Sequence, residues 1–128
     1  MAEAVLEHVN ITVSDGARAA QMLQAIFGWR VRWEGPAKGG GYSRHVGTDD
    51  QYVVVYMLPP ADPKEEPPKR MPMGRLNHVG VVVSDLAFTE RRVLEAGLRP
   101  FNHGDYEPGR RFYFLDPDGV EYEVVSYG

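Results

Sequence analysis

The sequence LEHVNITVSD, residues 6–15, recurs as LNHVGVVVSD at residues 76–85. Six of the ten positions are identical: the leucine, the histidine, two valines and the closing Ser-Asp pair. Two valine-rich strands can share valines by chance, but the shared histidine and Ser-Asp pair require another explanation. Because an internal repeat determines architecture, we predict that the chain is a duplication of one module.

The residues after each copy also follow the same pattern. The Ser-Asp pair can cap a helix, expected at residues 17–27 and 87–96, and further strand-like runs follow. We place the two modules at about residues 5–58 and 76–126. The connector, residues 59–74, holds six of the chain's ten prolines, which disfavour helix and remove backbone donors. It is therefore expected to be an extended linker.

Period-two alternation separates the two faces of each predicted strand. In residues 8–13 and 79–83, one face is apolar and suits a covering helix, while each histidine stands on the other face. An unpaired carboxylate in a pocket on that face would be costly, and a cation would neutralise it. The polar side chains predicted on the faces turned away from the helices include His8, Asn10, His78, Glu121 and Glu123.

Composition excludes several kinds of chemistry and partner. The 128 residues, enough for one ordinary domain, contain no cysteine, which excludes disulfides, thiolate metal sites and cysteine nucleophiles. A net charge of -4 and the absence of a long basic run argue against a nucleic-acid partner. No apolar run approaches the roughly 20 residues of a membrane span, and no signal peptide is recognisable. We therefore expect a cytoplasmic protein without a membrane partner.

The repeated motifs and FYFLDPDGVEYEVV, residues 112–125, resemble the vicinal oxygen chelate superfamily. That superfamily includes glyoxalase I, fosfomycin-resistance transferases, methylmalonyl-CoA epimerases, type I extradiol dioxygenases and bleomycin-resistance proteins. The resemblance implies an α+β fold of one glyoxalase-like domain, residues 1–128. Two βαβββ modules would form a cupped, incompletely closed eight-stranded sheet with the helices outside. The resemblance also implies a homodimer and a small-molecule substrate or ligand.

By the same resemblance, the metal ligands fall on His8, His78 and Glu123, the last lying four residues after Gly119 as in the family pattern DPDGNxxE. Two imidazoles and one carboxylate suit a divalent ion of Fe, Mn, Ni, Co or Zn. Open coordination positions would let an oxygen-rich substrate chelate the ion, which would act as a Lewis acid. In the alternative interpretation, the same three residues line a pocket that holds no metal.

The chain departs from glyoxalase I at a fourth ligand, a glutamate that also acts as general base in that enzyme. Aligning residues 120–124 with residues 51–55 puts Val54 at this position. Valine neither binds a metal nor moves a proton, so glyoxalase I activity itself is not expected. Tyr52 and Tyr56 would share the face of Val54 and suit a ligand pocket.

Glu121 points the same way as Glu123, so both are candidate catalytic carboxylates, although Glu121 also suits the solvated mouth of a pocket. Tyr113 matches a substrate-binding tyrosine of the fosfomycin-resistance transferases. His45 and His103 are expected at the surface rather than as ligands. The candidate substrate-binding residues are Asn10, Arg44, Tyr52, Tyr56 and Tyr113.

These observations favour a glyoxalase-superfamily protein that is a divalent-metal-dependent lyase, isomerase or transferase acting on a small oxygen-rich metabolite. The alternative is a non-catalytic small-molecule (drug) binding protein of the bleomycin-resistance type, which would need no metal. The retained His-His-Glu set favours the enzyme, whereas the missing fourth ligand and the tyrosine-bearing face favour the binding protein.

Overall fold

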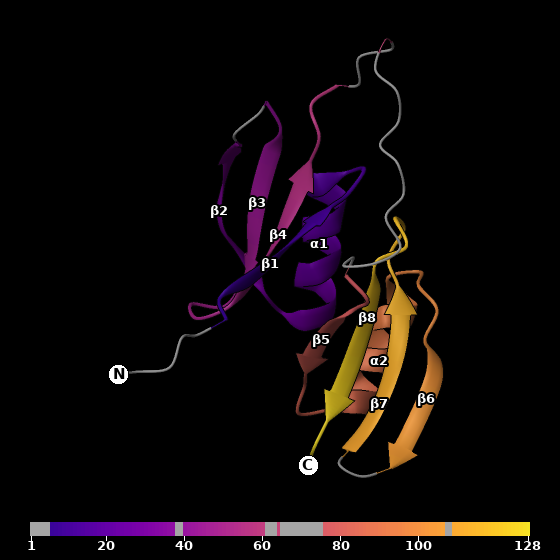
Figure 1. Cartoon of the computed structure of the whole chain (residues 1–128). Coiled ribbons are helices and arrows are strands. Elements are labelled where there is room, and N and C mark those ends of the chain that lie inside the picture. Colours follow the sequence, from indigo (N-terminus) through magenta and orange to yellow (C-terminus); the bar gives the residue numbers. More distant parts are fainter. Residues whose placement is uncertain (1–5, 38–39, 61–63, 65–75, 107–108) are drawn as a thin grey trace. The chain divides into compact units, whose positions relative to one another are not determined.

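The structure is a computed structural model that describes residues 6–37, 40–60, 64, 76–106 and 109–128. It divides into two compact units, residues 1–61 and 62–128, each with one helix and four strands in the order β-α-β-β-β (Figure 1). The first unit contains β1 (His8–Thr12), α1 (Gly16–Phe27), β2 (Arg30–Pro36), β3 (Tyr42–Gly47) and β4 (Tyr52–Met57). The second contains β5 (Val79–Val82), α2 (Leu86–Glu95), β6 (Phe101–Tyr106), β7 (Gly109–Leu115) and β8 (Glu121–Ser126).

Each unit has one four-stranded mixed sheet, and the two sheets have the same topology. The strand orders are β1-β4-β3-β2 and β5-β8-β7-β6. In each sheet the first strand pairs in parallel with the last, and the other neighbours pair antiparallel. The predicted α+β class and the two βαβββ modules are confirmed. In the part of the chain that the structure describes, the eight strands form two separate sheets and no closed barrel.

The repeated Ser-Asp pair determines where each helix begins. The Asp15 carboxylate accepts a hydrogen bond from the Arg18 backbone N–H, and the Asp85 carboxylate accepts one from the Phe88 N–H, both at 3.0 Å. Each bond satisfies one of the backbone donors that the first turn of a helix leaves unpaired. Helix α1 ends at Phe27 and is capped by Gly28, whose φ of 72° lies in the left-handed region that favours glycine.

The core of each unit lies between its helix and one face of its sheet. Strand alternation supplies this face with apolar side chains, the largest fully buried of which are Val46 and Val55 in the first unit and Phe112, Phe114, Tyr122 and Val124 in the second, and the helices add Leu23 and Val93. The opposite face, here called the distal face, carries the polar side chains. It comprises the residues that alternate with those buried ones, such as His8, Tyr52 and Val54 in the first sheet and Arg111, Tyr113 and Glu123 in the second.

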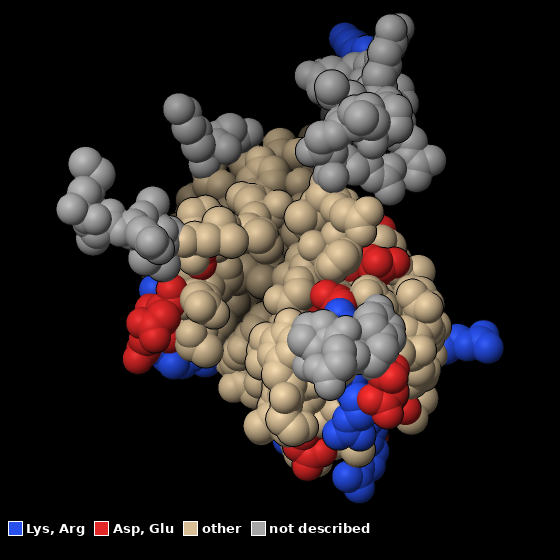
Figure 2. Space-filling model, turned by 60° about the horizontal axis from the view of Figure 1, so that its bottom comes forward, with Lys and Arg blue, Asp and Glu red and all other residues tan. Residues whose placement is uncertain are grey.

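None of the helices in the described ranges is long and apolar enough to cross a membrane. Figure 2 shows one face of the molecule, on which acidic side chains lie beside basic ones. Among the described residues drawn there, the basic side chains do not form the continuous basic patch with which proteins commonly bind nucleic-acid phosphates.

Candidate functional site

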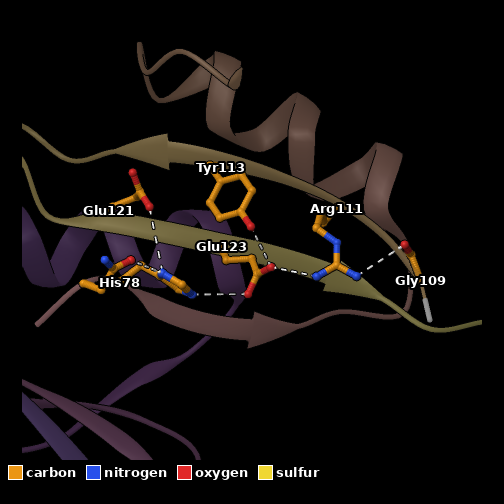
Figure 3. A network of polar contacts seen from close by, with 7 residues as sticks. His78, Gly109, Arg111, Tyr113, Glu121 and Glu123 are labelled. Carbon is orange, nitrogen blue, oxygen red and sulfur yellow. Dashed lines mark hydrogen bonds and ion pairs between the residues drawn. The ribbon is translucent and has the colours of Figure 1, made fainter. Parts of the chain in front are cut away.

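Four polar side chains gather on the distal face of the second sheet (Figure 3). Glu123 comes from β8 and faces Tyr113, its cross-strand partner on β7. Arg111 lies two residues from Tyr113 on β7 and therefore shares its face. His78, immediately before β5, completes the cluster, because β5 pairs with β8 and brings the histidine beside the carboxylates.

The two carboxylate oxygens of Glu123 have different surroundings. Oε2 accepts hydrogen bonds from the Tyr113 hydroxyl and the Arg111 guanidinium, both at 2.9 Å, whereas Oε1 lies 3.5 Å from His78 Nε2. Burial on its own would raise the pKa of Glu123, but the hydrogen bonds from Tyr113 and Arg111 outweigh it and hold the pKa below its usual value. Glu123 is therefore ionised at neutral pH, with one oxygen anchored and the other turned toward His78.

His78 lies between polar partners on both sides of its ring. Its Nδ1 is 2.7 Å from the amide oxygen of Asn77 and 3.9 Å from the carboxylate of Glu121. The ring of Tyr113 meets it edge-on, with 6.0 Å between ring centroids. Glu121 thus lies at the margin of the cluster, on the same face as Glu123, with about a third of its side chain exposed.

The pair of His78 and Glu123 fits two ligands of one metal ion. Nitrogen and oxygen ligands that each lie about 2.1 Å from an ion at a tetrahedral angle are about 3.4 Å apart. The separation of 3.5 Å between His78 Nε2 and Glu123 Oε1 is close to this value. Imidazole nitrogen and carboxylate oxygen are also donors that divalent transition metals accept.

Over the described ranges of the chain, no three His, Cys, Asp or Glu side chains are grouped in a way that would hold a metal. The second unit brings together two of the three predicted ligands, His78 and Glu123. His8 belongs to the first unit, and the convergence of all three ligands stays a prediction.

A row of four rings crosses the distal face of the first sheet, one from each strand. His8 on β1 stacks on Tyr52 of β4 with 4.9 Å between ring centroids, and Tyr52 stacks on His45 of β3 at 4.7 Å. Trp33 of β2 follows, with its ring centroid 5.0 Å from that of His45. The guanidinium of Arg32 lies 4.4 Å over the Tyr52 ring, a cation–π contact. These four residues, here called the ring row, form one continuous aromatic cluster across the sheet.

Polar contacts set the charges along the ring row. The Glu7 carboxylate accepts hydrogen bonds from His8 Nδ1 at 2.8 Å and from the Tyr52 hydroxyl at 2.9 Å, and these bonds lower the pKa of Glu7. The bond to Glu7, together with burial, raises the pKa of Tyr52. Burial is the main cause that lowers the pKa of His45, and the nearby Arg32 guanidinium adds to it, so His45 is neutral at pH 7.

Strand register shows which residues of the two units are equivalent. Asn10 and Gly80 each stand two residues after a repeated histidine, and they pair with Val54 and Glu123 respectively. Val54 therefore occupies the position of Glu123 in the first unit, as the alignment of the two strands predicts. His45 pairs with Val54, whereas Tyr113 pairs with Glu123. The first sheet thus has the ring of His45 opposite a valine, whereas the second sheet has the ring of Tyr113 opposite a carboxylate.

The remaining predicted substrate-binding residues lie on two different faces. Asn10 and Tyr56 are on the distal face of the first sheet, with Tyr52 and Val54. Arg44 alternates with these residues and lies on the helix side, where a Cβ added to Gly16 at the start of α1 would come 2.5 Å from its guanidinium. Its Nε is 3.7 Å from the Glu34 carboxylate.

The sequence reasoning assigned His45 to the surface, and it did not place the side chains of Glu7, Arg32, Trp33, Asn77 and Arg111. For Arg111, the spacing of two residues from Tyr113 was an available signal, because it puts both side chains on one face. For His45, the signal was the antiparallel pairing of its strand with residues 51–55, which sets it opposite Val54. Glu7 lies before the first strand begins, so alternation carries no information about its direction.

A search of curated proteins finds no match to this chain. Among solved structures, a glyoxylase/bleomycin resistance protein/dioxygenase domain from Frankia sp. EAN1pec is 18% identical, with a TM-score of 0.80 and coverage of 99% of this chain and 100% of that one. The fosfomycin resistance protein FosX from Mesorhizobium loti is 22% identical, with a TM-score of 0.68 and coverage of 98% and 92%. A mutant of FosX from Listeria monocytogenes, crystallised with Mn(II) and 1S,2S-dihydroxypropylphosphonic acid, is 16% identical, with a TM-score of 0.71 and coverage of 98% and 93%.

These structural similarities establish the fold. The family model of the Glyoxalase/Bleomycin resistance protein/Dioxygenase superfamily matches residues 5–124, almost the entire chain, and includes both repeated motifs. The chain belongs to this superfamily.

Proposed function

We propose that this protein is a divalent-metal-dependent lyase, isomerase or transferase that acts on a small oxygen-rich metabolite. Its metal ligands would be His8, His78 and Glu123. The observation that carries the proposal is the arrangement of Glu123, whose Oε2 is anchored by two donors while its Oε1 faces His78 Nε2 at 3.5 Å. A carboxylate held in this way can bind an ion through one oxygen without first losing side-chain freedom.

Each residue of the second-unit cluster has a defined part in the proposed chemistry. Tyr113 and Arg111 orient Glu123 through their hydrogen bonds to Oε2. Glu121 is the candidate proton acceptor, since it adjoins His78 and its partial exposure allows proton exchange with water. The bound ion would supply Lewis-acid stabilisation of negative charge on a substrate oxygen.

Two further observations support an oxygen-rich ligand and a divalent metal. The chain belongs to the glyoxalase superfamily, and the FosX mutant with the same fold was crystallised with Mn(II) and a dihydroxylated phosphonic acid. In this chain the proposed pocket would also use Asn10, Tyr52 and Tyr56, which project from the distal face of the first sheet.

Titration with Mn²⁺, followed by loss of the electron paramagnetic resonance signal of the free ion, tests the proposal. We expect one bound ion per chain, and an affinity at least tenfold lower in Glu123→Gln and in His78→Ala. Glu95→Gln is the matched control, because it removes a charge from an exposed position at the end of α2 in the same unit. Absence of Mn²⁺ binding by the unmodified protein, in titrations repeated with Zn²⁺ and Ni²⁺, would refute the proposal.

Two observations favour a second candidate, a non-catalytic small-molecule binding protein of the bleomycin-resistance type. The Arg111 guanidinium already neutralises Glu123, so the buried carboxylate has a counter-charge without any metal. The ring row of the first sheet offers an organic ligand an aromatic contact surface, with Trp33 half exposed at its β2 end. Quenching of Trp33 fluorescence by bleomycin, abolished in Trp33→Phe but not in Trp29→Phe, together with silent metal titrations, would favour this candidate.

We further propose that the protein works in the cytoplasm as a homodimer. Sedimentation of the purified chain tests the assembly, since the monomer has a mass of 14.4 kDa. A single species of this mass over the micromolar range would exclude the dimer.

A further inference from the structure

In both units, the residue immediately before the repeated histidine contacts the Nδ1 atom of that histidine. Glu7 Oε1 lies 2.8 Å from His8 Nδ1, and Asn77 Oδ1 lies 2.7 Å from His78 Nδ1. Consecutive residues within a strand point to opposite faces and do not meet in this way. Here the contact forms because Glu7 and Asn77 both lie before their strands begin, where the alternation does not apply.

The contact at His8 determines which ring nitrogen carries the proton. An ionised carboxylate has no proton to donate, so His8 Nδ1 must be the donor in its bond to Glu7. In a neutral imidazole the other nitrogen, Nε2, is then unprotonated and has a free lone pair. Glu7 is itself fixed by the Tyr52 hydroxyl, which donates to the same Oε1 atom at 2.9 Å. Stacking of His8 on Tyr52, with 18° between the ring planes, sets the orientation of the imidazole.

The contact at His78 has the same geometry but a different chemistry. The amide oxygen of Asn77 accepts from Nδ1 without carrying a full charge, and the nearest carboxylate on that side, Glu121, is 3.9 Å away. Nε2 of His78 is again the atom on the other side of the ring, turned toward Glu123. The two histidines are therefore held alike, one by a carboxylate and one by an amide.

We propose that Glu7 is a positioning residue that fixes His8 as the Nδ1–H tautomer, so that Nε2 is the atom that binds the metal. Asn77 has the corresponding role for His78. The metal-binding part of this inference rests on the function proposed above, whereas the tautomer is a property of the metal-free protein. A carboxylate behind a ligating imidazole increases its basicity, so His8 is expected to be the stronger donor of the two.

Long-range ¹H–¹⁵N correlation spectra of the metal-free protein at pH 8 report directly which nitrogen of each histidine is protonated. We expect the Nδ1–H pattern for His8, a shift toward Nε2–H in Glu7→Ala, and retention of Nδ1–H in Glu7→Gln, whose amide oxygen can still accept. Glu95→Gln, which removes one acidic charge from the other unit, should leave the spectrum of His8 unchanged. An Nε2–H pattern for His8 in the unmodified protein, or no response to Glu7→Ala, would overturn the proposal.

Mn²⁺ titration by electron paramagnetic resonance is the second measurement. Loss of a partner behind a ligating histidine lowers metal affinity by about 10–100-fold, which is the range expected for Glu7→Ala. Glu7→Gln should recover a large part of that loss, a recovery that general destabilisation would not produce. Equal affinities of Glu7→Ala and the unmodified protein would overturn the positioning role. If the unmodified protein binds no ion while His8 still shows the Nδ1–H pattern, the proposed metal function fails and the hydrogen-bond assignment stands.

Discussion

Substitution of Arg111 by methionine tests whether the ion pair with Glu123 stabilises the second unit. The side chains of Arg111 and Glu123 are only 13% and 16% exposed. Without Arg111, the Glu123 carboxylate would therefore lose its counter-charge while it remains largely shielded from water. Removal of one partner from a buried pair costs about 3–5 kcal/mol, because the remaining charge is unpaired. Here the Tyr113 hydroxyl still donates to Oε2 at 2.9 Å, and the residual exposure admits some water. We therefore expect the free energy of unfolding to fall by about 2–3 kcal/mol at pH 7.

The dependence of this loss on pH separates charge from packing. In the folded protein, Tyr113 and Arg111 hold the pKa of Glu123 below its usual value, so its contribution to stability is present above the unfolded pKa and is lost as the pH falls through the folded pKa. Without Arg111, burial of the carboxylate works against ionisation, and protonation removes the unpaired charge. The difference between the variant and the parent should therefore be largest at neutral pH and shrink as the pH approaches 4.

Urea unfolding followed by circular dichroism at several pH values measures these free energies. Arg110→Met is the matched control, since Arg110 is the neighbouring arginine on β7, is exposed, and points to the other side of the strand. Its effect should stay within about 0.5 kcal/mol. Equal losses in the two variants, or a loss for Arg111→Met that does not change with pH, would show that the ion pair is not responsible for the loss.

Substitutions at four further positions have expected outcomes that stability measurements check. Asp116 is 5% exposed and its Oδ2 has no partner in the described part of the chain. Burial raises the pKa of Asp116, so its contribution to stability falls as the pH rises through that pKa. Asp116→Asn should therefore be neutral or stabilising at pH 7, whereas Asp116→Ala should cost about 1–3 kcal/mol. Gly47→Ala should cost more than about 2 kcal/mol, because the added Cβ would come 2.6 Å from Tyr52 Cα, while Gly80→Ala meets nothing closer than 3.7 Å and should be tolerated. Val54→Glu buries a carboxylate at a position that is 4% exposed, so it should lower the free energy of unfolding of the metal-free protein by about 2–4 kcal/mol. Mn²⁺ should restore part of this loss if the ion binds there.

The fold and one half of the site were predictable because they depend on local periodicity. The repeat located both modules, and its Ser-Asp pair marked the residues that cap α1 and α2. Alternation in residues 120–125 put Glu121 and Glu123 on the face away from the helix, and the structure brings both of them beside His78. Each of these inferences uses only the geometry of a single helix or strand.

The partners of the site residues were not predictable to the same degree, because they depend on register between strands. The direction of Arg44 follows from its pairing with Val55, which puts it on the helix side, and a shift of one residue would reverse it. The placement of Arg32 over Tyr52 depends on the irregularity between Val31 and Trp33, where the pairing of β2 with β3 shifts. Such irregularities have no signal in the alternation pattern.

The duplication has preserved the backbone register of the two sheets while their distal faces have acquired different chemistry. At one pair of equivalent positions the second unit has Glu123, bound by Tyr113 and Arg111, and the first unit has Val54. His45, the counterpart of Tyr113, therefore has no carboxylate opposite it and stacks on Tyr52 instead. The second unit thus holds a fixed anion, and the first holds a row of rings that includes two imidazoles. Under the proposed function, substitutions in the second-unit cluster should accordingly act mainly on metal affinity, whereas those in the ring row other than at His8 should act mainly on recognition of the organic ligand.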